Sequence, residues 1–213
     1  MVTLRVTEIF RSLQGESRTV GWPTVFIRLT GCPLRCTWCD TAYAFTGGTR
    51  MTLDEILAAV AAQATSRVCV TGGEPLAQPG CLPLLDALVA AGYAVSLETS
   101  GALDVAGVHP AVVKVMDLKP PGSGEVAANR YENLAHLGPA DQIKFVIRDD
   151  ADYAWSKDMV RDYGLETRCE VLFSPVAGAL DATELADRIL QDRLNVRLQI
   201  QLHKYLWGDR TGV

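Results

Sequence analysis

The stretch Cys32-Pro33-Leu34-Arg35-Cys36-Thr37-Trp38-Cys39 places three cysteines within eight residues, in the spacing C-x3-C-x2-C. Three thiols this close in the chain favour a metal site, because a disulfide would leave one of them unpaired. A structural zinc site needs a fourth ligand, and the next cysteine along the chain is Cys69. Cysteine thiolates also hold four-iron clusters, and three protein ligands leave one iron open to another molecule. We therefore predict a cluster with an open iron, and a zinc site with a remote fourth ligand is the alternative.

Length and composition indicate one compact domain. The chain has 213 residues, a formal net charge of -5, 48% hydrophobic residues and 21% charged residues. We treat residues 1–213 as a single domain of this kind. The first ten residues carry Arg5 and Glu8 and lack the apolar core of a signal peptide, and no apolar run is long enough to span a bilayer. We expect a cytoplasmic protein without a membrane partner.

Cysteine usage and charge narrow the class of partner. Cysteines of a cytoplasmic protein more often bind metals or lie in the core than form disulfides. A nucleic-acid interface needs clustered Lys and Arg, and this mildly acidic chain has no such cluster. A small-molecule substrate is therefore the expected partner.

Short apolar runs alternate with helical patterns along the chain. The predicted strands cover 5–10, 24–29, 68–71, 94–98, 112–117, 142–146, 170–173 and 197–200. Helices are predicted to begin at Thr52, Leu82, Asp150 and Asp181, and Thr52 with Glu55 forms a capping box. This alternation indicates right-handed crossovers and a mostly parallel sheet. Polar motifs follow several of the strands, so we expect the site at the carboxyl ends of the strands.

Several motifs resemble known families. The cysteine triplet followed by Thr71-Gly72-Gly73-Glu74-Pro75 resembles the radical S-adenosylmethionine superfamily, although two glycines alone would indicate an ordinary turn. Six further motifs, in order along nearly the whole chain, resemble the 7-carboxy-7-deazaguanine synthases. They are Glu8–Glu16, Phe26–Cys32, Cys39–Thr41, Glu98–Gly101, Asp117–Pro121 and Gln201–Lys204.

The resemblance implies a fold and a reaction. The fold would be α/β, an incomplete TIM-like barrel of mostly parallel strands with few helices. The enzyme would be a lyase that converts 6-carboxy-5,6,7,8-tetrahydropterin to 7-carboxy-7-deazaguanine with loss of ammonia, in queuosine and other 7-deazapurine biosynthesis. A 4Fe-4S cluster, S-adenosylmethionine and Mg²⁺ would be its cofactors. The radical forms on the cofactor, so no side chain receives a catalytic role. The family also implies a homodimer and a flavodoxin- or ferredoxin-type electron donor.

The same resemblance assigns residues to the cofactors. Cys32, Cys36 and Cys39 would bind the cluster, and Thr41 would bind Mg²⁺. The residues expected at S-adenosylmethionine are Trp38, Cys39, Asp40, Gly73, Asp117, Leu118, Lys119, Phe173, Ser174, Pro175 and Val176. The residue types alone have other interpretations: a turn hydroxyl for Thr41 and a solvated cation for Lys119. Trp38, Leu118 and Phe173 would then be core residues.

A second set of residues would bind the substrate: Leu13, Gln14, Gly15, Glu16, Arg28, Thr71 and His203. A pterin edge offers adjacent donors and acceptors, and the Gln14 amide presents one of each. Arg28 lies in an apolar strand and needs an anionic partner, which is either the substrate carboxylate or a structural one. A solvated carboxylate is the alternative for Glu16, and a core histidine is the alternative for His203.

Two other functions stay open at this point. A glycyl-radical activase has the same cysteine triplet but acts on a protein, so it would need neither the segment 13–15 nor an arginine aimed at a carboxylate. A zinc-binding interaction module would contain zinc and be colourless, whereas a cluster protein prepared without oxygen is brown. Direct action on tRNA is disfavoured because the sequence shows no basic patch.

Overall fold

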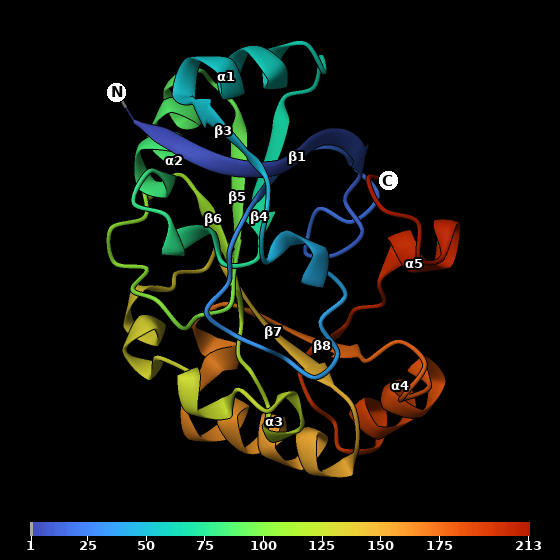
Figure 1. Ribbon diagram of the computed structural model, residues 1–213. Helices are drawn as coiled ribbons and strands as arrows, with labels where there is room; N and C mark the ends of the chain where they lie inside the picture. Colours follow the sequence, from blue (N-terminus) through green and yellow to red (C-terminus); the bar gives the residue numbers. More distant parts are fainter. Residues whose placement is uncertain (1) are drawn as a thin grey trace.

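The computed structural model describes residues 2–213, and within them nine strands form one sheet (Figure 1). The sheet order is β3-β1-β2-β4-β5-β6-β7-β8-β9. Strand β1 pairs antiparallel with β2 and β3, and every later pairing is parallel. The strands are β1 Thr3–Leu13, β2 Pro23–Leu29, β3 Thr49–Thr52, β4 Arg67–Gly72, β5 Ala94–Thr99, β6 Val113–Asp117, β7 Gln142–Ile147, β8 Glu170–Pro175 and β9 Arg197–Leu198.

The sheet is open, because its order runs from β3 to β9 without a pairing between these ends. In the described part of the chain, five α-helices accompany it: α1 Leu53–Ala61, α2 Cys81–Ala90, α3 Asp150–Asp162, α4 Ala182–Gln191 and α5 Leu202–Trp207. Between β6 and β7 the described chain forms short 3-10 turns and no α-helix, at 121–123, 126–128 and 131–136. The mostly parallel, incomplete barrel with few helices is therefore confirmed.

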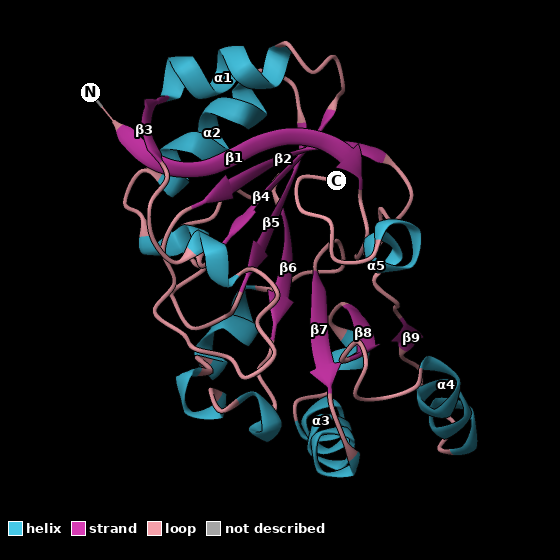
Figure 2. Cartoon of the chain, turned by 45° about the vertical axis from the view of Figure 1, so that its right-hand side comes forward, coloured by secondary structure: helices cyan, strands magenta, loops and turns pink. Residues whose placement is uncertain are grey.

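The helices cover the sheet in two groups (Figures 1 and 2). Ile56 of α1 and Leu84 of α2 lie in one apolar cluster with β1, β2, β4 and β5. Val160 of α3 and Leu185 of α4 lie in a second cluster with β6, β7 and β8. The predicted capping box is present, because Thr52 accepts from the Glu55 N–H (3.3 Å) and Glu55 accepts from the Thr52 N–H (2.7 Å). Burial of one helix face against the sheet stabilises each layer.

Some elements differ from the sequence-based prediction. The edge strand β3 has the sequence TRMT, with none of the apolar enrichment that predicted the other strands. Helix α5 has only six residues, which is too short for a helical repeat to stand out in the sequence. His203 therefore lies on a helix that was not predicted. Thr71 and Ser174 belong to strands β4 and β8 and do not follow them. No helix in residues 2–213 has the length and apolar character to cross a membrane.

The two glycines after β4 bring that turn against the segment that enters the cysteine triplet. A Cβ on Gly72, which has a φ of 144°, would lie 2.1 Å from the Leu29 carbonyl oxygen. A Cβ on Gly73 would lie 2.2 Å from the Gly31 carbonyl oxygen and 2.7 Å from the Cβ of Cys32. The Gly73 N–H donates to the Leu29 carbonyl (3.2 Å). Only glycine permits this close approach of two backbones.

We predict that Gly72→Ala lowers the free energy of unfolding by about 2 kcal/mol or more, because the new Cβ meets backbone and the φ is unfavourable. Urea denaturation of the cluster-free protein measures the change. Gly138→Ala is the matched control, because the nearest atom to its Cβ would be 4.0 Å away and its φ is outside the left-handed region. Equal stability of the two variants would contradict the prediction.

Candidate active site

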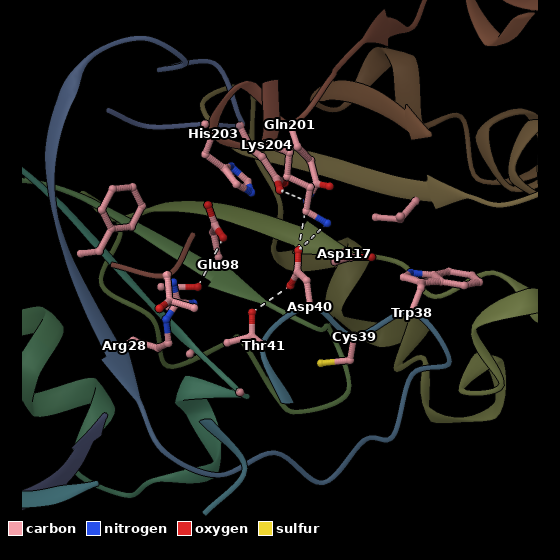
Figure 3. A pocket seen from close by; sticks show the side chains of 18 of the residues that line it. Arg28, Trp38, Cys39, Asp40, Thr41, Glu98, Asp117, Gln201, His203 and Lys204 are labelled. Atoms are coloured by element: carbon pink, nitrogen blue, oxygen red, sulfur yellow. Dashed lines mark hydrogen bonds and ion pairs between the residues drawn. The ribbon is translucent and has the colours of Figure 1, made fainter. Parts of the chain in front are cut away.

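A cavity of about 700 Å³ opens at the carboxyl ends of the parallel strands. The ends of β1, β2, β4, β5, β6 and β7 contribute to its wall, together with the cysteine loop, helix α5 and the C-terminal residues 208–213. Figure 3 shows side chains from these distant segments pointing toward one another. The volume falls in the range of small-molecule sites, about 300–1,000 Å³.

Three free thiols lie on this wall. Cys32 and Cys36 are half-buried and Cys39 is exposed, and all three line the cavity. The other three cysteines, which are buried away from the cavity, are Cys69, Cys81 and Cys169. The described residues of the wall therefore include no fourth cysteine. In residues 2–213 no three His, Cys, Asp or Glu side chains are gathered around the position of a single metal ion. This arrangement fits a wider, multi-iron cluster with one open iron better than a closed zinc site.

The cysteine loop is anchored to the loop after β6. The Thr37 N–H donates to the Ser123 carbonyl (3.0 Å), and the Thr37 hydroxyl donates to the Gly122 carbonyl (2.9 Å). Arg35 closes the loop on itself by donating to the Cys32 carbonyl (2.8 Å). Trp38 lines the cavity with the Arg148 guanidinium 5.9 Å from its ring, so it is not a core aromatic. These contacts hold the loop open toward the cavity.

Glu74 joins the turn after β4 to the turn after β5. Its side chain is fully buried and accepts hydrogen bonds from the Thr99 hydroxyl (3.0 Å) and the Ser100 N–H (2.7 Å). The Leu76 N–H donates to it as well (3.0 Å). A buried carboxyl is expensive unless its oxygens are satisfied, so this set of donors stabilises both turns. Glu74 stands within the glycine-rich motif, although that motif alone predicts no role for it.

The predicted substrate segment lies on the opposite side of the cavity. Leu13, Gln14, Gly15 and Glu16 all line it. The Leu202 N–H donates to the Gly15 carbonyl (2.9 Å), which docks α5 on this segment. A Cβ on Gly15 would lie 2.1 Å from Nδ1 of His203, so the imidazole rests directly on bare backbone. His203 is half-buried and lines the cavity, so the core-histidine interpretation is wrong.

Buried charges run from this segment to the cysteine side. The Lys144 ammonium donates to Glu16 and lies 3.6 Å from Oδ2 of Asp117, and Lys119 lies 3.1 Å from the same oxygen. Burial opposes the charge of Glu16, but Lys144 holds the pKa of that carboxyl below its usual value. Burial also opposes the charge of Lys144, yet Glu16 and Asp117 raise its pKa well above the ordinary value. Glu16 and Lys119 are therefore paired groups and not solvated ones.

Arg28 has a structural partner and also faces the cavity. Its Nε donates to Oε1 of Glu8 (2.7 Å), and the Tyr43 hydroxyl donates to the same oxygen (2.8 Å). The guanidinium lies 5.8 Å from the centre of the Phe10 ring. Its terminal nitrogens make no hydrogen bond with any residue in the range 2–213. They are left for an anion in the cavity that Arg28 lines.

Asp40 connects the cysteine loop to the C-terminal segment. It accepts from the Thr41 hydroxyl (2.8 Å) and from the Gln201 amide (3.3 Å), and Lys204 lies 3.4 Å away. Burial opposes the charge of Asp40, but Lys204 lowers the pKa of this carboxyl below its usual value. Thr41 lines the cavity beside it, and its hydroxyl donates to the Asp40 side chain and not to backbone.

Most residues of the predicted site line the cavity, and a few do not. Leu118, Phe173, Ser174 and Pro175 are buried and absent from its wall, whereas Val176 lies on it. Leu118 and Phe173 pack in the second apolar cluster, so their side chains belong to the core and not to the cavity wall. Several wall residues had no predicted role, among them Glu98, Lys144, Gln201 and Lys204. Lys144 was predictable by the same reasoning as Arg28, because it is a lone cation in an apolar strand.

Comparison with known proteins identifies the family. Residues 26–117 match the radical SAM superfamily model. The 7-carboxy-7-deazaguanine synthase of Koribacter versatilis is 47% identical over 98% of this chain and 99% of its own length, and that of Chlorobaculum tepidum is 46% identical over 99% and 97%. The crystal structure of QueE from Escherichia coli matches with a TM-score of 0.75 and 25% identity, covering 94% of this chain and 95% of that one. The chain therefore belongs to the 7-carboxy-7-deazaguanine synthase family of radical S-adenosylmethionine enzymes.

Proposed function

We propose that this lyase converts 6-carboxy-5,6,7,8-tetrahydropterin to 7-carboxy-7-deazaguanine with loss of ammonia, as a step of queuosine and other 7-deazapurine biosynthesis. One observation carries the proposal. A single cavity has three thiols without a fourth on one side, and Arg28 with the segment 13–16 on the other. The first side suits a cluster with an open iron, and the second suits a planar substrate that carries a carboxylate.

On the cofactor side, Cys32, Cys36 and Cys39 would hold the 4Fe-4S cluster. When bound, the cluster and S-adenosylmethionine supply the carbon radical that begins the reaction. The bare backbone of Gly73 and the side chains of Asp117 and Lys119 would border S-adenosylmethionine. The Asp117 Oδ1 atom is buried without a hydrogen-bond partner among the described residues, as expected of an acceptor that awaits a ligand.

On the substrate side, each proposed residue has a chemical reason. Glu16 stays ionised beside Lys144 and can accept hydrogen bonds from the amino-pyrimidine edge of a pterin. The terminal nitrogens of Arg28 would hold the carboxylate and so orient the reacting carbon. His203 and Thr71 lie on the same wall. The Thr41 hydroxyl is our candidate for Mg²⁺, which prefers oxygen ligands and keeps several waters.

The partners of the enzyme are proposed from the family likeness. They are a small-molecule substrate, an electron donor of flavodoxin or ferredoxin type and a second copy of the chain in a homodimer. The same likeness supports a place in the cytoplasm.

Anaerobic incubation with the tetrahydropterin, S-adenosylmethionine, Mg²⁺ and a reductant tests the activity. We expect the deazaguanine product and an equal amount of ammonia, and weaker turnover without Mg²⁺. Cleavage of S-adenosylmethionine by an intact cluster without any deazaguanine would rule out the proposed substrate.

The cluster ligands are tested by substitution. We predict that Cys32→Ala, Cys36→Ala and Cys39→Ala each lose most of the iron and sulfide of the anaerobically prepared protein, because each removes one of only three thiolates. Cys169→Ala is the matched control, because Cys169 is buried in the second apolar cluster and not on the cavity wall. Iron and sulfide analysis with the visible spectrum provides the measurement. Full iron content in any variant of the triplet would remove that cysteine from the ligand set.

The substrate clamp is tested at Arg28. We predict that Arg28→Ala lowers kcat/KM by about 30-fold or more, equivalent to about 2 kcal/mol, because the substrate carboxylate loses its cation. Iron content should stay at the level of the unsubstituted protein. Arg11→Ala is the control, since Arg11 is exposed on the same strand pair and does not line the cavity. Loss of folding in Arg28→Ala, seen by circular dichroism, would favour a purely structural pairing with Glu8.

A further inference from the structure

Glu98, at the end of strand β5, is a carboxyl group on the cavity wall that no assigned role uses. It is half-buried and lines the cavity between the two proposed ligand sides (Figure 3). Its contacts are two long hydrogen bonds, one from the Gln14 amide and one from the Thr71 hydroxyl, each of 3.3 Å. Gln14 and Thr71 are both proposed substrate residues, so Glu98 lies next to the place where the substrate would bind.

Glu98 differs from the neighbouring carboxylates because it has no ion pair. Asp40 pairs with Lys204 and Asp117 pairs with Lys119, and Glu16 pairs with Lys144. Within residues 2–213 no cation lies within ion-pair distance of Glu98. Asp209, the other cavity carboxylate without such a partner, is exposed on the C-terminal segment. Among the described residues, Glu98 is therefore the inner carboxyl group of the wall that no cation pairs with directly.

Charged groups from three other segments act on Glu98: Glu16 after β1, Arg28 of β2 and Lys144 of β7. Burial raises the pKa of Glu98, and the nearby charge of Glu16 adds to this effect. Lys144 of β7 and Arg28 of β2 act in the opposite direction, but the net shift is upward. The thiol of Cys69 in β4 also faces this carboxyl group, and its own pKa is raised by burial. Glu98 therefore keeps its proton to a higher pH than Glu16 or Asp40.

The proposed reaction requires two proton transfers that the radical step does not supply. Ammonia leaves only if a C–N bond breaks and the nitrogen gains a proton. The aromatic five-membered ring forms only if a base removes a proton from the adjacent ring carbon. One group can perform both steps if it is an acid that becomes a base once its proton has been transferred.

We propose, building on the proposed function, that Glu98 is the catalytic acid and base of ammonia loss. The O–H bond of its carboxyl group breaks as the proton moves to the leaving nitrogen, and the electron pair of the C–N bond departs with ammonia. The carboxylate left behind then takes the proton of the adjacent ring carbon, and the C–H electron pair becomes the ring double bond. This restores the carboxylic acid, and the two steps need neither an oxidant nor a reductant.

The decisive variant is Glu98→Gln, which keeps the shape and a hydrogen-bonding group but cannot exchange a proton. The substrate is labelled with deuterium at the carbon that bears the carboxylate, where the radical step begins. Transfer of deuterium into S-adenosylmethionine reports the radical step, and ammonia release reports the later steps. We expect deuterium transfer to persist in Glu98→Gln while ammonia release falls by about 100-fold or more. Glu98→Asp should recover part of the loss.

The control is Glu170→Gln, because Glu170 belongs to a partly exposed ion pair with Arg18 outside the cavity. This control should release ammonia at the unsubstituted rate. Equal losses of deuterium transfer and ammonia release in Glu98→Gln would assign Glu98 to substrate positioning and overturn the proton role. Unchanged ammonia release would overturn it as well. Absence of deuterium transfer and product in the unsubstituted enzyme would instead overturn the proposed function.

A second measurement does not depend on turnover. In the cluster-free protein, the infrared band of a protonated carboxylic acid should persist above the ordinary pKa of a glutamate and disappear in Glu98→Gln. With the loaded enzyme, ammonia release should decline as pH rises through the pKa of Glu98, because the acid form is the reactive one. That decline should be missing from the residual activity of Glu98→Gln. An ionised Glu98 at low pH in the unsubstituted protein would contradict the proposal.

Discussion

The cavity depends on a buried junction at Glu74, where three separate turns meet. The Glu74 N–H donates to the Gly31 carbonyl (2.8 Å), which fixes the segment entering the cysteine loop. Its carboxyl group accepts from Thr99 and Ser100, which fixes the turn after β5. The side chain is fully buried, so losing any of these donors would leave an unsatisfied polar atom in the core. Since Gly73 permits the close approach next to it, backbone geometry and one side chain together set where Cys32 lies.

Buried charges link the two sides of the cavity to each other. Lys144 lies between Glu16, on the proposed substrate side, and Asp117, on the proposed cofactor side. Residues that share one ammonium cannot be treated as independent, and their substitutions should not be additive. Breaking such a buried pair leaves an uncompensated charge, which costs more than the pair itself contributes. The same pairing explains why the pKa of Glu16 is lowered although burial opposes its charge, whereas the pKa of Glu98, which has no ion-pair partner among residues 2–213, is raised.

Local patterns predicted the parallel strands and the helix caps, because apolar runs and capping residues act over a few positions. Strand β3 and helix α5 were missed since an edge strand and a six-residue helix carry little local signal. The cavity network was harder still, because Lys144 and Glu16 are 128 residues apart in the chain. Glu98 and Gln201 belong to motifs that resemble the family. Only the folded arrangement, however, shows which carboxylates of the cavity form ion pairs with a cation.

Arg28 illustrates why residue types alone leave such choices open. The sequence offered a structural carboxylate or a substrate carboxylate as alternatives, and the fold makes them compatible. A guanidinium has five N–H donors in one plane, and Glu8 engages only Nε. That bond, with Tyr43 on the same Glu8 oxygen, fixes the plane of the group and leaves its other edge toward the cavity. A donor edge held rigid before the ligand arrives loses little entropy on binding, which is what an orienting clamp requires. The structural pairing with Glu8 is therefore compatible with the proposed binding role and would support it.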